Sequence, residues 1–181
     1  MQVYTNSTDN DNDNERLIQI TWKARKGFIY DASTLERISE FTFSTTQNEG
    51  WGICYDEANN EFIVSDGSNV LHFWDGVTLE EKRRVEVYRH NGNKANSMNE
   101  LEFVNGKVLA NVWYHDVILV IDPVTGVCES EYDFSHLWPK AERRQFGADV
   151  LNGISISKDD GILYITGKKW NRMYKLKLRN F

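Results

Sequence analysis

The sequence predicts an all-β protein whose sheets repeat along the chain like the blades of a β-propeller. Short segments rich in β-branched and aromatic residues alternate with turns from residue 16 onward. Similar residues recur at strand ends at offsets of roughly 44 to 55 residues, the period expected for four-stranded blades. The turns carry hairpin chemistry, of which Asn105-Gly106 is the clearest example.

The strands are expected in four successive groups. In order they are 16–21 and 27–31; 52–56, 61–65 and 70–75; 100–104, 107–113 and 117–122; and 153–157, 162–166 and 173–178. Asp31, Asp75 and Asp122 each end a strand and are followed by a turn sequence. An aspartate at this position favours a turn because its carboxylate can accept hydrogen bonds from the next backbone N–H groups.

The register of the repeat follows from the residues at the ends of the second strands. Polar and aromatic side chains gather there in each group. The stacked segments are Thr21-Trp22-Lys23, Ser65-Asp66-Gly67, Asn111-Val112-Trp113 and Thr166-Gly167-Lys168. A ring of sheets with such strand ends predicts one central site.

A short helix is expected within residues 133–145, inserted between two groups of strands. Ser135 suits the N-cap and Pro139 the first turn. The basic residues Lys140, Arg143 and Arg144 would suit the C-terminal end of the helix dipole.

Composition excludes several classes of protein. The formal charge is −6, the isoelectric point is near 5.3 and no basic patch is visible, so no nucleic-acid partner is expected. No apolar run approaches the ~20 residues that cross a bilayer, and the polar N-terminus shows no signal peptide. Residues 1–15 are rich in Asn and Asp and are expected to be disordered, which leaves 16–181 as the propeller domain.

Neither a metal nor a cofactor is expected. The two cysteines, Cys54 and Cys128, lack the spacing of a metal site, and a disulfide between them stays open. The four histidines show no ligand spacing. Three of the six tryptophans, Trp74, Trp138 and Trp170, are expected to pack in the interior.

Seven short words, in order over residues 17–178, resemble the plant and bacterial type of glutaminyl-peptide cyclotransferase. They are Leu17-Ile-Gln-Ile-Thr-Trp22, Glu49-Gly-Trp-Gly52, Ser65-Asp-Gly-Ser68, Met98-Asn-Glu-Leu-Glu102, Ala110-Asn-Val-Trp113, Asp149-Val-Leu-Asn-Gly-Ile154 and Thr166-Gly-Lys168. The resemblance implies a five-bladed propeller without a catalytic metal, in a family whose members are commonly exported. It implies conversion of N-terminal Gln on peptides or proteins to pyroglutamate, with release of ammonia.

The same resemblance assigns five site residues. Trp22, Trp51 and Trp113 would line the substrate pocket, because rigid indole walls can hold the folded Gln side chain. Asn99 and Lys168 would be catalytic. Asn99 can both donate and accept hydrogen bonds, and Lys168 can stabilise negative charge on the oxygen of the tetrahedral carbon.

One residue that the family needs has no match. Its catalytic glutamate belongs to a Phe-x-Glu-Gly word upstream of the tryptophan matched to Trp22. That position falls near Thr8, where no Glu-Gly occurs and where Asp9 or Asp11 would be the acidic substitute. With blades of about 40–45 residues, the chain supplies roughly three and a half blades of five, the loss lying on the N-terminal side.

Two alternatives to an active enzyme follow from this gap. One is an inactive propeller that keeps its pocket and binds peptides. The other is a fragment that forms no stable ring. An open ring would also leave blade edges unpaired, which would favour self-association by strand addition.

Overall fold

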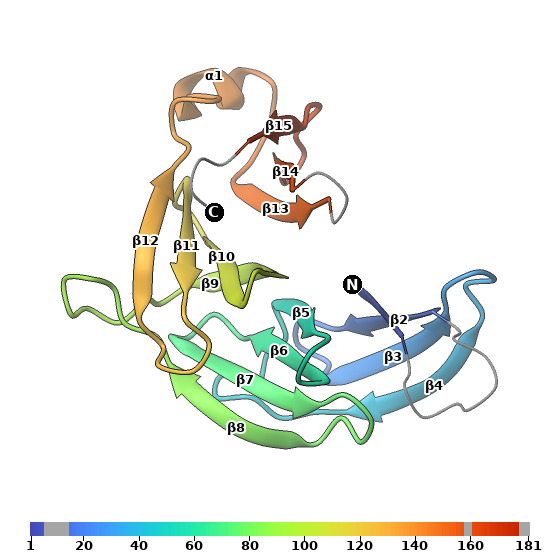
Figure 1. The fold of residues 1–181 in the computed structure, drawn as a ribbon. Helices are drawn as coiled ribbons and strands as arrows, with labels where there is room; N and C mark the ends of the chain where they lie inside the picture. Colours follow the sequence, from blue (N-terminus) through green and yellow to red (C-terminus); the bar gives the residue numbers. More distant parts are fainter. Residues whose placement is uncertain (6–14, 158–160, 178–181) are drawn as a thin grey trace.

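The computed structural model describes residues 1–5, 15–157 and 161–177. Their strands form four antiparallel sheets that follow one another around an open arc (Figure 1). The arrangement is all-β and propeller-like, and the described residues contain one short helix, α1 (Lys140–Gln145). None of the described helical residues forms a segment long and apolar enough to span a bilayer.

Each sheet is a meander in which consecutive strands pair. The first sheet has β1 (Gln2–Thr5), β2 (Glu15–Ile20), β3 (Lys26–Asp31) and β4 (Arg37–Thr42). The second has β5 (Gly52–Asp56), β6 (Glu61–Ser65), β7 (Val70–Asp75) and β8 (Glu81–Glu86). The third has β9 (Met98–Val104), β10 (Lys107–Val112), β11 (Val117–Ile121) and β12 (Cys128–Asp133). The fourth has β13 (Leu151–Ile156), β14 (Leu163–Gly167) and β15 (Tyr174–Leu176).

The core consists of three apolar layers, each between two successive sheets. Strand β10 shows how one sequence serves two layers. Val108 and Ala110 face the second sheet, whereas Leu109 faces the fourth. Because both faces are buried, the middle strands are continuous apolar runs rather than alternating ones. Cys54 and Cys128 lie in one of these layers as buried free thiols, not as a disulfide.

The predicted aspartate turns are present in the first three sheets. The Asp31 carboxylate accepts hydrogen bonds from the backbone N–H groups of Ser33 and Thr34. Asp75 and Asp122 make the same pair of bonds to the residues two and three positions on. Hydrogen bonding to the charged form lowers the pKa of the Asp31 carboxyl to about 2. The repeat predicted from the sequence is therefore visible at atomic detail.

The structure corrects the sequence analysis at the outer strands. The described residues form four sheets rather than three and a half blades, because β1 and β4 complete the first sheet. The outer strands β4, β8 and β12 have no counterpart among the expected strands. These strands carry exposed polar side chains at half or more of their positions and therefore lack a continuous apolar signal. They are edge strands that close each sheet on its solvent side.

The N-terminus and the helix also differ from expectation. Gln2–Thr5 forms β1 and pairs with β2, so the segment expected to be disordered over 1–15 contributes a strand; residues 6–14 lie outside the described part. The helix begins at Lys140 with Pro139 at its N-cap. Ser135 is not the cap, because its backbone N–H instead donates to the Asp133 carboxylate in the preceding turn.

Candidate active site

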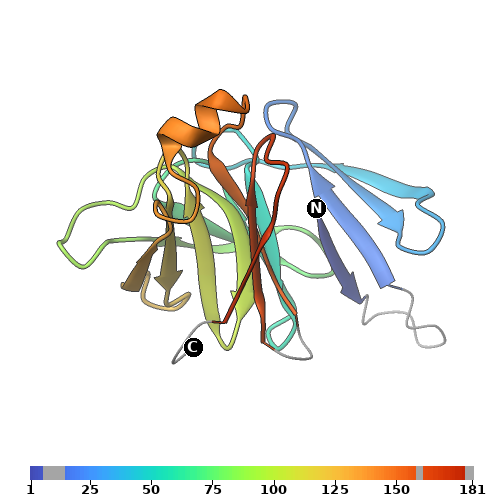
Figure 2. The same ribbon diagram turned by 90° about the horizontal axis from the view of Figure 1, so that it is seen from above.

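The five predicted site residues line one pocket of about 310 Å³. They come together because loops after even-numbered strands all emerge at the same end of a set of meanders, here called the pocket end. Figure 2 shows α1 and the loop after β2 at this end. The pocket is lined by Trp22, Gly50, Trp51, Asn99, Trp113, Asn152 and Lys168.

Two of the three indoles are held by one carboxylate. Glu49 Oε2 accepts a hydrogen bond from Trp22 Nε1 at 2.6 Å and from Trp51 Nε1 at 2.7 Å. Glu49 is itself held by Thr45, whose hydroxyl donates to the Glu49 carbonyl oxygen at 2.8 Å and accepts its backbone N–H at 3.1 Å. The two bonds from the indole N–H groups to the ionised Glu49 carboxylate are charge-assisted, and such bonds are about twice as strong as neutral ones. Glu49 therefore sets the spacing of two pocket walls.

The third indole forms the facing wall. The ring of Trp113 meets the ring of Trp51 edge-on, with centroids 5.2 Å apart and planes at 88°. The ring of Tyr114 also contacts Trp113, with ring centroids 4.2 Å apart, and Lys168 Nζ lies 5.9 Å from the centre of the Trp113 ring. Edge-to-face geometry is the favoured arrangement for two such rings. The pocket is thus an aromatic slot with one ammonium group at its side.

Asn99 is fixed by the close approach of the inner strands β5 and β9. A Cβ at Gly52 would collide with the Asn99 carbonyl oxygen. That oxygen accepts a hydrogen bond from Ser65 Oγ at 2.6 Å. Because the backbone is locked in this way, the Asn99 side chain, in a residue only 6% exposed, has a defined position in the pocket wall.

Sequence reasoning missed Asn152 as a pocket residue. Its signal was present, since it belongs to the word Leu151-Asn152-Gly153-Ile154 at the start of β13. Its Oδ1 is buried and has no hydrogen-bond partner in the structure. A buried acceptor without a partner costs about 1–3 kcal/mol, so an N–H donor entering the pocket would be stabilised there.

Comparison with known proteins agrees with this pocket. A family model described as glutamine cyclotransferase matches residues 11–178. The chain belongs to the glutamine cyclotransferase family. It is 35% identical over 168 residues to a glutaminyl-peptide cyclotransferase of Arabidopsis thaliana, covering 91% of this chain and 50% of that protein. It is also similar to the crystal structure of Myxococcus xanthus glutaminyl cyclase, with a TM-score of 0.78 and 32% identity, covering 90% of this chain and 68% of that one.

The family resemblance inferred from the seven words is therefore confirmed. The chain spans about half the length of the curated relative that it matches. The relatives are named as cyclases, which gives no support to the alternative of an inactive peptide-binding propeller. Among the described residues, no group of three or more His, Cys, Asp or Glu side chains could hold a metal ion.

The acid/base glutamate that the resemblance implies stays unassigned. Thr8, Asp9 and Asp11 all fall within residues 6–14, outside the part of the chain that the structure describes. Glu100 follows Asn99 on β9, and burial raises the pKa of its carboxyl while the Met1 amino group and the Lys168 ammonium oppose the rise. Glu100 is thus an acid with a perturbed pKa near Lys168, although it does not line the pocket.

A second polar network holds the loop between β4 and β5 (residues 43–51), which contains Glu49. Asp66 Oδ2 accepts the backbone N–H of Gln47 at 2.6 Å and lies 3.3 Å from His72 Nε2. Asp66 Oδ1 accepts from the Ser68 hydroxyl and backbone N–H. Burial by itself would raise the pKa of Asp66, but these bonds lower it to about 2. In this cyclotransferase-family chain, the loop that positions two indoles therefore rests on a buried carboxylate.

Proposed function

We propose that this protein is a glutaminyl-peptide cyclotransferase, which converts the N-terminal Gln of peptides or proteins to pyroglutamate. The observation that carries the proposal is the pocket itself. Three indoles, the carboxamide of Asn99 and the ammonium of Lys168 surround one cavity at the pocket end of the sheets. The names of the two relatives support the same activity.

The reaction joins the α-amino nitrogen of the substrate to the side-chain carboxamide carbon and expels ammonia. The two reacting groups belong to one residue, so catalysis requires the side chain to fold back and stay folded. Trp22, Trp51 and Trp113 would hold that compact shape and so reduce the entropic part of the barrier.

The polar groups would act on the reacting atoms. Lys168 would stabilise the oxygen that becomes negative when the amine adds to the carboxamide. Asn99 would orient the carboxamide or the amine, and the free acceptor of Asn152 would receive an N–H of the substrate. Ammonia leaves only when protonated, so a proton must pass from the attacking amine to the departing nitrogen.

An ammonia-release assay with a neutral Gln-Phe dipeptide tests this function. We expect turnover by the protein and a loss of about 10²–10³ in kcat when Lys168→Ala removes the oxyanion partner. Lys169→Gln is the matched control, since Lys169 adjoins Lys168 in the sequence but does not line the pocket. An unchanged rate in Lys168→Ala would remove Lys168 from the mechanism. Absence of ammonia release by the unmodified protein would overturn the proposed function.

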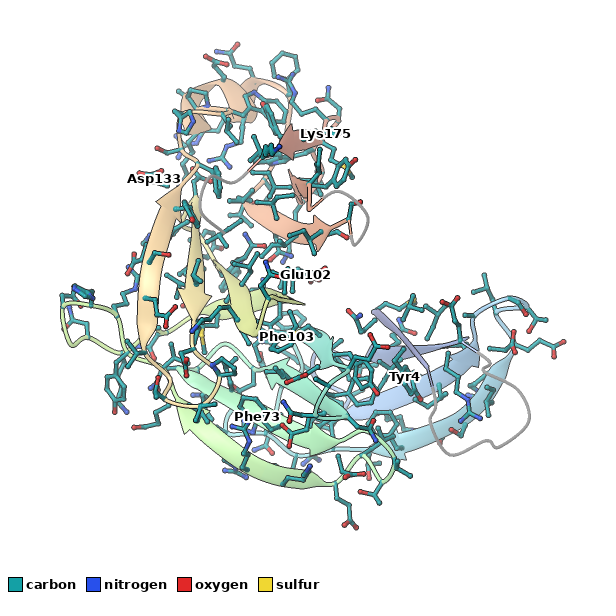
Figure 3. The ribbon with its side chains drawn as sticks, in the orientation of Figure 1. Tyr4, Phe73, Glu102, Phe103, Asp133 and Lys175 are labelled. Carbon is teal, nitrogen blue, oxygen red and sulfur yellow. The ribbon has the colours of Figure 1, made fainter. Side chains whose placement is uncertain are left out.

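We also propose that the four sheets are four blades of a five-bladed ring. The chain covers 68% of the Myxococcus glutaminyl cyclase chain, which leaves about a third of that chain, enough for a further blade, without a counterpart. A cavity of about 570 Å³ is lined by residues of all four sheets, among them Tyr4, Tyr55, Glu102 and Ile156, so the first and fourth sheets face each other across it. Figure 3 shows Tyr4 and Glu102 on opposite sides of this opening. Sheets left open in this way would favour self-association.

A further inference from the structure

Charge is segregated between the two ends of the sheets. The seven loops of the pocket end (21–25, 43–51, 66–69, 87–97, 113–116, 134–150 and 168–173) hold ten Lys or Arg and five Asp or Glu. Within the described residues, the loops of the opposite end hold four acids and no base: Glu36, Glu57, Glu80 and Asp122. The chain as a whole carries −6, so the positive potential at the pocket end is local.

A basic hollow adjoins the pocket at this end. It has a volume of about 240 Å³, and Lys140, Arg143 and Arg144 contribute its positive charge. We call it the basic hollow. Its acidic lining residues are Asp116 and Asp149, of which Asp116 is ion-paired to Arg143.

The basic hollow and the indole pocket share their dividing wall. Trp113 lines the pocket, and the next residue, Tyr114, lines the hollow. On the other side, Lys168 lines the pocket and donates its backbone N–H to the carbonyl oxygen of Val150, which lines the hollow, at 2.9 Å. A peptide whose first residue sits in the pocket must leave it at the pocket end, and the hollow lies beside that exit.

Arg143 gives the hollow a buried positive charge. The residue is only 3% exposed and its guanidinium lies 5.3 Å from the centre of the Trp170 ring. Its Nη2 contacts the Asp116 carboxylate, whereas Nε and Nη1 have no hydrogen-bond partner in the structure. A buried cation satisfied on one side only retains an attraction for a further anion. The side chains of Lys140 and Arg144 are exposed and free to close over such an anion.

We infer that the basic hollow is a subsite for a carboxylate side chain of the substrate, located on the residues that follow the N-terminal Gln. The inference rests on the proposed cyclisation at the indole pocket. An extended chain advances about 3.3–3.6 Å per residue. Because the two cavities share a wall, the second to fourth residues of the peptide are the ones that reach the hollow. The protein therefore prefers acidic peptide N-termini to basic ones.

The test is a series of C-terminally amidated peptides that begin with Gln and place Glu, Ala or Lys at position 2, 3 or 4 in an alanine background. Amidation leaves the side chain as the only carboxylate, and the free-acid form of the alanine peptide tests a terminal carboxylate separately. We expect the Glu peptide at one position to exceed the Ala peptide about three- to tenfold in kcat/KM, chiefly through KM. The Lys peptide falls below both, and 0.5 M salt reduces the preference.

The double variant Lys140→Gln, Arg144→Gln identifies the source of the preference. Both side chains are exposed, so the fold is expected to survive, and the Glu-to-Ala ratio of kcat/KM falls towards one. Lys175→Gln removes another exposed lysine, from β15 outside the hollow (Figure 3), and keeps the ratio of the unmodified protein. A ratio near one at all three positions in the unmodified protein overturns the inference. So does a preference that the double variant retains.

A binding measurement separates this inference from the proposed function. Quenching of tryptophan fluorescence reports peptide binding without turnover, since three indoles line the pocket. If no peptide releases ammonia, the proposed cyclase activity fails, and the ratio of dissociation constants for the Glu and Ala peptides then decides the subsite. Equal dissociation constants reject it, and a ratio that the double variant abolishes supports it.

Discussion

Glu49 shows how one side chain can organise a site without touching the reacting atoms. Its carboxylate holds the indoles of Trp22, in the β2–β3 loop, and Trp51, directly before β5. Trp22 is 57% exposed, so packing alone does not fix it. We regard Glu49 as a positioning residue, because its single Oε2 atom determines how far apart two walls of the pocket stand.

Removal of this acceptor should loosen the pocket. We expect Glu49→Ala to lower kcat/KM by about 10- to 100-fold and Glu49→Gln by less, because a neutral amide oxygen still accepts, but more weakly. Steady-state kinetics with a Gln dipeptide measures the loss, and acrylamide quenching measures the freed Trp22. Glu36→Gln, at the opposite end, is the control. If Glu49→Ala kept the parent's kinetics and quenching, the indoles would not depend on the carboxylate.

At the scale of elements, the loop before β5 depends on the end of β6. Asp66 follows β6 and accepts the backbone N–H of Gln47, while His72 on β7 lies within 3.3 Å of both Asp66 Oδ2 and Thr46 N. Gly67 permits this arrangement, because it has a positive φ of 83° and a Cβ there would collide with the Trp51 ring. The buried polar network of Asp66 and His72, at the end of β6 and on β7, thus fixes the position of the loop that precedes β5.

The Asp66 network should make stability depend on acid pH. The folded pKa of Asp66 is about 2, below its ordinary value of 3.8, so its contribution of about 2 kcal/mol is complete above pH 4 and is lost as pH falls towards 2. Urea unfolding at pH 7 and pH 3 measures this. We expect the stability loss between these pH values to be about 1 kcal/mol smaller in Asp66→Asn than in the parent.

Other turn aspartates, such as Asp31, also have lowered pKa values and remain in both proteins. The difference between parent and variant therefore isolates Asp66. Equal losses in the two proteins would show that the carboxylate of Asp66 does not stabilise the fold through its charge.

At the scale of the whole molecule, each inner sheet is stabilised by neighbours on both faces, whereas among residues 1–5, 15–157 and 161–177 the first and fourth sheets have a packed neighbour on one side only. Within the same residues the fourth sheet has three strands and each of the others four. These two features leave apolar and backbone groups at the ends of the arc without the partners that inner sheets have.

We expect the chain to self-associate at micromolar concentration through these ends. Sedimentation velocity over a tenfold range of concentration measures the mass, and urea unfolding followed at each concentration measures the coupling to stability. The midpoint should rise with concentration, because association stabilises the folded state. A monodisperse monomer with one sharp, concentration-independent transition would contradict this expectation.

Local sequence determined the repeat and most of the strands. Apolar segments such as Val117–Ile121 and turn residues such as Asp122 act over a few neighbours, and their recurrence is visible without a structure. The resemblance then placed Trp22, Trp51, Trp113, Asn99 and Lys168, and all five line one cavity. Their catalytic and binding roles stay predictions.

Only the tertiary structure decided which groups meet across long stretches of chain. Nothing local pairs Glu49 with Trp22, or buries Arg143 of a polar helix against Asp116. Each contact arises where a loop within one sheet meets the connection that leads to the next sheet. The outer strands, such as β8, could not be predicted from the sequence, because an edge strand that faces water needs no apolar pattern. Local patterns determine the strands and turns. Which polar and aromatic side chains meet in the site is decided when residues far apart in the sequence are brought together and removed from water, because a buried polar group needs a partner.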